Sequence, residues 1–143
     1  IRLGEVYLNY AEALNEYYGE SRQDEVLEYL NAIRERAGIP GYEDSYSQEE
    51  MREMIRHERK IELCYECQRF FDVRRWFIAH GPNGAFNHNE YGLDMSKGEN
   101  ATDKEFFSMT EAAIKRFDIK HYLMPIKASE CELNTELVQA PFY

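Results

Sequence analysis

The stretch that decides the fold is SQEEMREMIRHERKIELCYECQRFFDVRRW, residues 47–76. Ser47 and Glu50 have the spacing of a capping box, in which each side chain bonds the other residue's backbone N–H, so they predict a helix start. One face of that helix is then lined by five residues at three- and four-residue steps: Met51, Ile55, Glu58, Glu62 and Tyr65. The pattern continues beyond Cys67, and we expect a helical region over 47–78. The face is apolar at its start and charged in its middle.

Two carboxylates, Glu58 and Glu62, form the charged part of this face. A pair of carboxylates can act as acid and nucleophile in a glycoside hydrolase. However, neighbours on one helix rarely flank a bound sugar from two sides. The alternative is structural, because a buried carboxylate is tolerated when it is paired and hydrogen-bonded. The arginines available for such pairing are Arg34, Arg36, Arg59 and Arg69. We expect a structural role for both glutamates.

Upstream of this region, residues 1–40 show two helical patterns. The first has its apolar face at Leu3, Val6, Tyr7, Tyr10, Leu14 and Tyr17, and Gly19 is suited to end it. The second begins at about Asp24, carries Val26, Leu30, Ile33 and Ala37, and ends at Gly38 before Pro40. Together they predict a tetratricopeptide-like helical hairpin, which needs neighbouring elements to cover it. The sequence opens within the first helical pattern, so we expect a further part of the protein upstream of residue 1.

Residues 79–143 show weaker patterns. The segment 80–110 is rich in Asn, Gly and acidic residues and predicts a long loop. The segment 114–126 predicts an extended stretch, and Ser129 with Glu132 predicts the cap of one last helical turn. The expected fold class is therefore mainly α: a tetratricopeptide-like helical hairpin plus a long capped helix, with long loops and little strand.

Charge and composition exclude some partners. The 143 residues include 17 Lys and Arg against 27 Asp and Glu, a formal net charge of −10. Such a charge repels phosphate backbones, so we expect no nucleic-acid partner. No apolar run approaches the length of about 20 residues that a membrane-spanning helix requires.

The sequence gives no support for catalysis, a metal or a cofactor. Cys64 and Cys67 form a C-x-x-C pair that suits redox chemistry or half of a zinc site, but the helical pattern around them favours packed thiols that are reduced and metal-free. The third cysteine, Cys131, leaves an odd number. The four histidines lack ligand spacing, and no phosphate-binding loop or nucleophile elbow is present.

One run in the long loop has the composition of a sugar-binding surface: Phe86-Asn87-His88-Asn89-Glu90-Tyr91. Sugars stack their apolar faces on aromatic rings and bond their hydroxyls to planar polar groups. Asn87, His88 and Tyr91 are accordingly the candidate ligand-binding residues. The simpler alternative, which we favour, is a solvated loop whose Phe86 and Tyr91 pack against the body of the protein.

The whole chain resembles the C-terminal region of the SusD/RagB family of nutrient-binding lipoproteins. Residues 3–14 resemble its Y-L-x-x-A-E-A helix, and residues 30–40 resemble L-N-x-I-R-x-R-A-G-x-P. Residues 55–76 resemble I-R-x-E-R-x-x-E-L…E-G-x-R-x-x-D-L-x-R-W, and residues 120–139 resemble K-x-Y-L-x-P-I…N-x-x-L-x-Q. Two departures stand out. Cys67 occupies a position that is usually Gly, which suggests a straighter helix junction, and residues 140–143 read A-P-F-Y where N-P-G-Y is common.

The resemblance implies an α-helical fold with tetratricopeptide-like hairpins. It also implies a lipoprotein at the cell surface, anchored in the outer membrane through an N-terminal Cys upstream of this sequence. Such proteins capture oligosaccharides or peptides for a SusC-like TonB-dependent transporter, without catalysis, and their ligand residues lie mostly upstream of these motifs. The alternatives are a tetratricopeptide-like protein-interaction scaffold and, less favoured, a glycoside hydrolase using Glu58 and Glu62.

Overall fold

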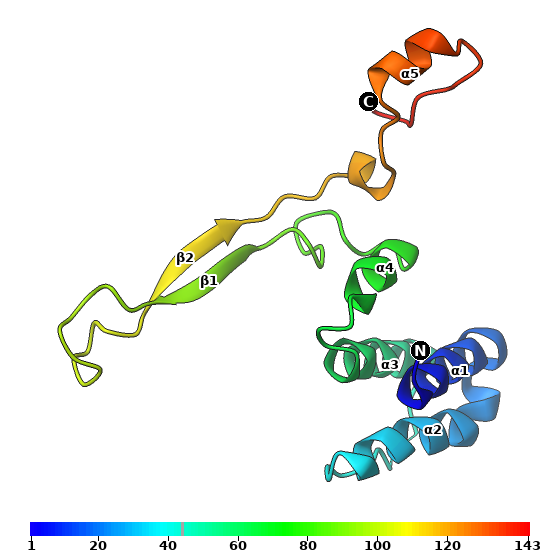
Figure 1. Cartoon of the computed structure of the whole chain (residues 1–143). Helices are drawn as coiled ribbons and strands as arrows, with labels where there is room; N and C mark the ends of the chain where they lie inside the picture. Colours follow the sequence, from blue (N-terminus) through cyan, green and yellow to red (C-terminus); the bar gives the residue numbers. More distant parts are fainter. Residues whose placement is uncertain (44) are drawn as a thin grey trace. The chain divides into compact units, whose positions relative to one another are not determined.

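A computed structural model describes residues 1–43 and 45–143. The chain divides into two compact units, Ile1–Phe70 and Phe71–Tyr143. The described elements, in chain order, are α1 (Leu3–Tyr18), η1 (Gly19–Arg22), α2 (Gln23–Arg36), α3 (Gln48–Glu62), α4 (Gln68–Arg75), β1 (Asn89–Asp94), β2 (Ser108–Ile114), η2 (Ile119–Tyr122) and α5 (Ala128–Leu133) (Figure 1). The chain is mostly helical with little strand, which confirms the predicted fold class.

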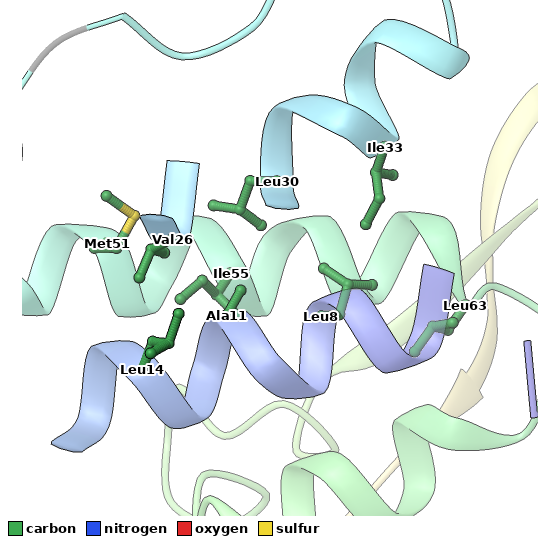
Figure 2. Packing of buried hydrophobic residues seen from close by; sticks show 9 residues of the cluster. All are labelled: Leu8, Ala11, Leu14, Val26, Leu30, Ile33, Met51, Ile55 and Leu63. Carbon is green, nitrogen blue, oxygen red and sulfur yellow. The ribbon is translucent and has the colours of Figure 1, made fainter. Parts of the chain in front are cut away.

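The first unit is a three-helix cluster around one apolar core. Helix α1 packs against both α2 and α3, and Figure 2 shows side chains from all three meeting between them. The buried residues of this core are Leu8, Ala11, Leu14, Val26, Leu30, Ile33, Met51, Ile55 and Leu63. The predicted faces of α2 and α3 are therefore confirmed at Val26, Leu30, Ile33, Met51 and Ile55, whereas Ala37 is exposed.

The predicted face of α1 was wrong at four of its six residues. Leu3, Val6, Tyr10 and Tyr17 are 63%, 47%, 42% and 81% exposed. Of the predicted residues, Leu14 is buried and Tyr7 packs against the core, where Leu8 and Ala11 join them. Helix α1 carries apolar residues on more than one side, so its periodicity fits two faces. Small and aliphatic side chains allow the close packing of α1 on α2 and α3, and Tyr10 and Tyr17 remain exposed.

The helix ends follow the local signals of the sequence. Gly19 and Gly38 have φ values of +58° and +74°, the left-handed backbone that glycine adopts most easily. The capping box at Ser47 and Glu50 is present, because each side chain bonds the backbone N–H of the other residue. These three boundaries were predicted correctly.

The helix predicted to run past Cys67 is instead two helices. Helix α3 ends at Glu62, a turn follows, and α4 begins at Gln68. Tyr65 and Cys67 have φ values of +64° and +61°, which no α-helix accommodates. The turn leaves Tyr65 fully exposed and exposes both Cys64 and Cys67. The predictions of a straighter junction and of packed thiols were therefore wrong.

In the second unit, the predicted long loop over 80–110 contains regular structure. Strand β1 pairs antiparallel with β2, with Leu93 opposite Met109 and Tyr91 opposite Glu111. A bulge between Glu90 and Tyr91 shifts the register. The loop prediction therefore holds only for the residues outside the strands.

A second buried cluster consists of Val73, Ala79 and Phe117, with Tyr122 packed against it. The Tyr122 hydroxyl accepts hydrogen bonds from the backbone N–H groups of Ala79 (2.8 Å) and His80 (3.3 Å). It also lies 2.8 Å from Nδ1 of His80. One side chain thus fixes the segment that follows α4.

The end of the chain contains the expected helical turn, α5, but its predicted cap is wrong. Lys127 occupies the N-cap position without a side-chain cap bond, and Ser129 lies inside the helix. The Gln139 side chain bonds both the N–H and the C=O of Ile126, each at 2.8 Å, which holds the C-terminal segment beside the start of α5. In the part of the chain that the structure describes, no helix is long and apolar enough to cross a membrane.

Candidate functional site

The first candidate site is the pair of glutamates on α3. Glu58 is 3% exposed, and its Oε2 lies 3.0 Å from Nη1 of Arg34 and 3.4 Å from the hydroxyl of Tyr42. The Arg34 guanidinium lies over the Tyr42 ring and donates to the carbonyl of Pro40 at 2.7 Å. Burial raises the pKa of Tyr42, and the nearby Glu58 carboxylate raises it further. Glu58 is therefore a buried partner in a polar cluster that joins α2, α3 and the segment between them.

Glu62 is held by two arginines. Its carboxylate bonds Arg2 and accepts two hydrogen bonds from Nη2 of Arg36, at 2.6 and 2.7 Å. Partial burial opposes ionisation, but the hydrogen bonds from Arg2 and Arg36 outweigh it and lower the pKa of Glu62. Helix α1 approaches closely here, since a Cβ on Gly4 would lie 2.9 Å from both Arg2 Nη1 and Glu62 Oε1. The site thus ties the N-terminal segment to the end of α3.

This geometry confirms that Glu58 and Glu62 are paired with arginine. Glu62 retains 10% of its side-chain surface, so it is nearly rather than fully buried. Arg34 and Arg36 are the predicted partners, whereas Arg59 bonds Asn9 at 2.6 Å and lies 3.8 Å from Glu12. Arg2 was missed, because nothing in its sequence position indicates contact with a residue 60 positions away. The arginines lower the pKa of Glu62, which suits a structural role and not a general acid.

The second candidate site is the aromatic and polar run before β1. The Asn87 side chain is already used within the fold: Nδ2 donates to the carbonyl of Gly81 at 2.7 Å, and Oδ1 accepts from the N–H of Phe117 at 3.4 Å. The Phe86 ring packs 5.8 Å from the Phe117 ring. These two residues therefore hold the loop against the second buried cluster, as the simpler alternative predicted for Phe86.

His88 and Tyr91, in contrast, are accessible. His88 is exposed and Tyr91 is 60% exposed, so the expected packing of Tyr91 against the body was wrong. Tyr91 lies opposite Glu111 in the sheet, and Asn89 donates to the Glu111 carboxylate at 2.5 Å. The Tyr91 ring, the Asn89 amide and the Glu111 carboxylate thus lie near one another at the start of the β-hairpin, and the exposed His88 directly precedes β1. This is a suitable set of groups for a polar ligand with apolar faces.

A third feature was not found from the sequence. A cavity of about 270 Å³ in the second unit is lined by Phe77, Ile119, Lys120, Tyr122, Leu123, Pro141 and Phe142. Phe77 stacks on Tyr122 at 4.4 Å, and both Phe77 and Phe142 have left-handed backbones, with φ values of +57° and +69°. The departure from N-P-G-Y at Phe142 was the one available signal. Within residues 1–43 and 45–143, no group of three or more His, Cys, Asp and Glu side chains is arranged to hold a metal ion.

Known proteins resemble this chain both in sequence and in structure. A sequence model of the SusD family matches residues 1–143. SusD-like proteins P2 and P25 of Formosa agariphila are 38% identical over 94 residues and 41% identical over 80 residues. These matches cover 59% and 54% of this chain, and 18% and 15% of the relatives. The crystal structure of a SusD-like protein from Bacteroides fragilis superposes with a TM-score of 0.82 at 34% identity, over 100% of this chain and 25% of that protein. The chain thus spans a quarter or less of these relatives.

Proposed function

The chain belongs to the SusD family, and from this membership we propose that the protein binds glycans, or other oligomeric nutrients such as peptides, at the cell surface. The proposal includes no catalytic step. The bound nutrient is delivered to a SusC-like TonB-dependent transporter in the outer membrane, where the protein is held by a lipid anchor. The observation that carries the proposal is the family match over residues 1–143.

The state of the two glutamates supports a binding role over hydrolysis. A retaining glycoside hydrolase needs one protonated and one ionised carboxyl group on either side of the sugar. Glu58 is buried against Arg34, and Glu62 is bonded by Arg2 and Arg36. The hydrogen bonds from Arg2 and Arg36 lower the pKa of Glu62, which does not suit a proton donor, and both carboxylates are engaged by arginine within the fold and do not face each other across a cleft.

Within this chain, we assign ligand contact to His88 and Tyr91. Both are accessible, and they lie beside Asn89 and Glu111, whose side chains offer hydrogen-bonding atoms to sugar hydroxyls or peptide groups. Asn87, the third candidate, is not assigned to the ligand, because its amide is already bonded to Gly81 and Phe117. We propose, from the resemblance to the family, that further ligand residues lie upstream of this sequence.

Calorimetry on the full-length protein with a panel of oligosaccharides and peptides tests the proposal. We expect saturable binding to one class of oligomer, with no new reducing ends or amino termini after prolonged incubation. The Tyr91→Ala variant is expected to weaken binding about tenfold, which corresponds to the loss of one stacking contact. Tyr91→Phe keeps the ring and serves as the matched control. Release of cleaved product by the wild-type protein would contradict the proposal.

A further inference from the structure

The hydroxyl of Tyr122 has three partners on the segment that follows α4. It accepts hydrogen bonds from the N–H groups of Ala79 and His80, at 2.8 and 3.3 Å, and it lies 2.8 Å from Nδ1 of the His80 ring. A hydroxyl has one proton to donate and two lone pairs that accept. Both lone pairs are used by backbone N–H groups, so the hydroxyl donates its proton to Nδ1. His80 is therefore the neutral tautomer, with its hydrogen on Nε2.

A second proton on His80 is incompatible with this arrangement. It would create an N–H at Nδ1, directed at a hydroxyl whose lone pairs are both occupied, and the hydroxyl proton would lose its acceptor. At least one of the three hydrogen bonds must then break. Histidine is the side chain whose charge ordinarily changes between about pH 5 and 8. The contact between His80 and Tyr122 is thus suited to respond to pH in this range.

The charged groups nearby do not neutralise a positive charge on His80. Six charged or titratable side chains lie on α4, on η2 or at the start of η2: Asp72, Arg74, Arg75, Asp118, Lys120 and His121. Asp72 pairs with Arg75 at 2.9 Å, and Arg74 donates to the carbonyl of Tyr122 at 2.7 Å. The His121 ring accepts from the N–H of Asp118 at 2.8 Å. In the part of the chain that the structure describes, none of the six is hydrogen-bonded or ion-paired to His80. A protonated His80 would therefore lack a carboxylate partner.

The contact holds the first end of the loop that leads to β1. The carbonyls of residues 78 and 79 accept from the N–H groups of residues 85 and 86, at 2.8 and 3.2 Å, so the two ends of the loop are bonded to each other. Tyr122 bonds the N–H groups of residues 79 and 80 and thereby fixes this paired base. His88, which is assigned to the nutrient, follows the base by two residues.

We propose that His80 and Tyr122 form a proton-sensitive clamp on the loop over residues 78–87. The clamp is closed while His80 is neutral, and it opens when Nδ1 takes up a proton from solvent. Opening releases the N–H groups of Ala79 and His80 and loosens the loop before His88. The last consequence rests on the proposed function: nutrient affinity falls as pH falls, because the loop no longer holds the start of the β-hairpin in place.

Hydrogen exchange of the full-length protein at about pH 7.5 and about pH 5.5 tests the clamp, because His80 changes charge between them. Each rate is divided by that of the unfolded chain at the same pH. In the wild type we expect protection at residues 79 and 80 to be about tenfold lower at the acid pH, which corresponds to the loss of one ordinary hydrogen bond.

Three variants identify the group that responds. His80→Asn places an amide oxygen near the position of Nδ1 and takes up no proton, so protection should stay high at both pH values. Tyr122→Phe lacks the hydroxyl, so protection should be low at both. His57→Asn is the matched control, because His57 is exposed on α3, and it should keep the wild-type difference between the two pH values.

Calorimetry at the same two pH values tests the consequence for binding. The probe is the oligosaccharide or peptide that binds the wild type most tightly in the panel described above. We expect its affinity to be about three- to tenfold lower at the acid pH in the wild type, in line with the loss of one hydrogen bond that orders the loop. His80→Asn should bind the probe equally well at both pH values.

Four results would count against the proposal. Equal protection of residues 79 and 80 at both pH values in the wild type would overturn the clamp, and so would a fall at acid pH that persists in His80→Asn. If His80→Asn does not fold, a fall that persists in Tyr122→Phe overturns the clamp instead. A clamp that opens while affinity stays constant would overturn its link to the nutrient. Failure of every probe to bind at either pH would contradict the proposed function, whereas the exchange rates would still decide whether the clamp exists.

Discussion

Residues Ile1–Phe70 bury nine apolar side chains in one cluster, whereas the cluster in residues Phe71–Tyr143 contains three. The first unit adds arginine–carboxylate pairs that join its three helices, at Glu58 and Glu62. The second unit relies on single side chains that bond distant backbone groups, notably Tyr122 and Gln139. The comparison shows where substitutions should matter: paired charges in the first unit and individual polar contacts in the second.

The largest expected effect is that of Glu58→Ala in the first unit. The substitution leaves Arg34 partly buried without its carboxylate partner, and breaking a buried pair in this way costs about 3–5 kcal/mol. Thermal and denaturant unfolding of the full-length protein measures the loss. Glu53→Ala is the matched control, because Glu53 pairs with Arg56 at 62% side-chain exposure and an exposed pair contributes about 0–1 kcal/mol. An equal loss of unfolding free energy in the two variants would show that the buried pair contributes no more to stability than the exposed pair.

The second unit should respond most to Tyr122→Phe. The ring and its stacking on Phe77 remain, but the N–H groups of Ala79 and His80 lose their acceptor. We expect a loss of about 1–3 kcal/mol, since partly buried donors are left unsatisfied. Hydrogen exchange should become faster at residues 79 and 80 and stay unchanged in α1–α3. Tyr143→Phe, at an exposed ring, is the control. Faster exchange throughout the first unit would show that the units are not energetically separate.

A smaller gain is expected from Cys67→Gly. Cys67 has a φ of +61°, and a residue with a Cβ in the left-handed region is strained by about 1 kcal/mol or more relative to glycine. Glycine should therefore raise stability by about 1 kcal/mol, as measured by denaturant unfolding. Cys64→Gly is the control, because Cys64 is not among the residues with positive φ and glycine only adds backbone freedom there. A loss of stability at position 67 would show that the thiol makes a contact that outweighs the strain.

The smallest effect concerns acid pH. The pKa of Glu62 is lowered in the folded protein, so folding favours its ionised form. This contribution is complete above the pKa of the unfolded chain, and it is lost as pH falls through the folded pKa. Melting temperature should therefore fall at acid pH, and the fall should be shallower in Glu62→Gln, which has no proton to bind. The same dependence of melting temperature on pH in both proteins would show that Glu62 does not contribute to the loss of stability at acid pH.

The sequence predicted the first unit better than the second, for identifiable reasons. Helix starts and ends depend on residues that are close in sequence. The helix ends at Gly19 and Gly38 and the capping box at Ser47 could therefore be predicted from the sequence alone. The break after Glu62 could not, because the left-handed positions are occupied by Tyr65 and Cys67 instead of glycine. The β-hairpin was missed because its loop has no short turn signature and its apolar residues point outward. Contacts across many residues, such as Arg2 with Glu62, leave no periodic signal.

Both departures from the family pattern acquire a physical meaning in the structure. Cys67 and Phe142 stand where the family pattern has glycine, and both have positive φ, at +61° and +69°. The backbone thus keeps the conformation that suits glycine while the side chain changes. At position 142 the added ring lines the apolar cavity beside Phe77 and Leu123.

The most direct test of the account measures stability and function together in the Glu62→Ala variant of the full-length protein. If Glu62 is a structural residue of a nutrient-binding protein, its removal leaves Arg2 and Arg36 without their shared partner and lowers the melting temperature. Nutrient affinity, measured by calorimetry below that temperature, should then match wild type, with no product cleaved by either protein. An unchanged melting temperature together with the loss of a hydrolytic activity present in the wild type would contradict the account.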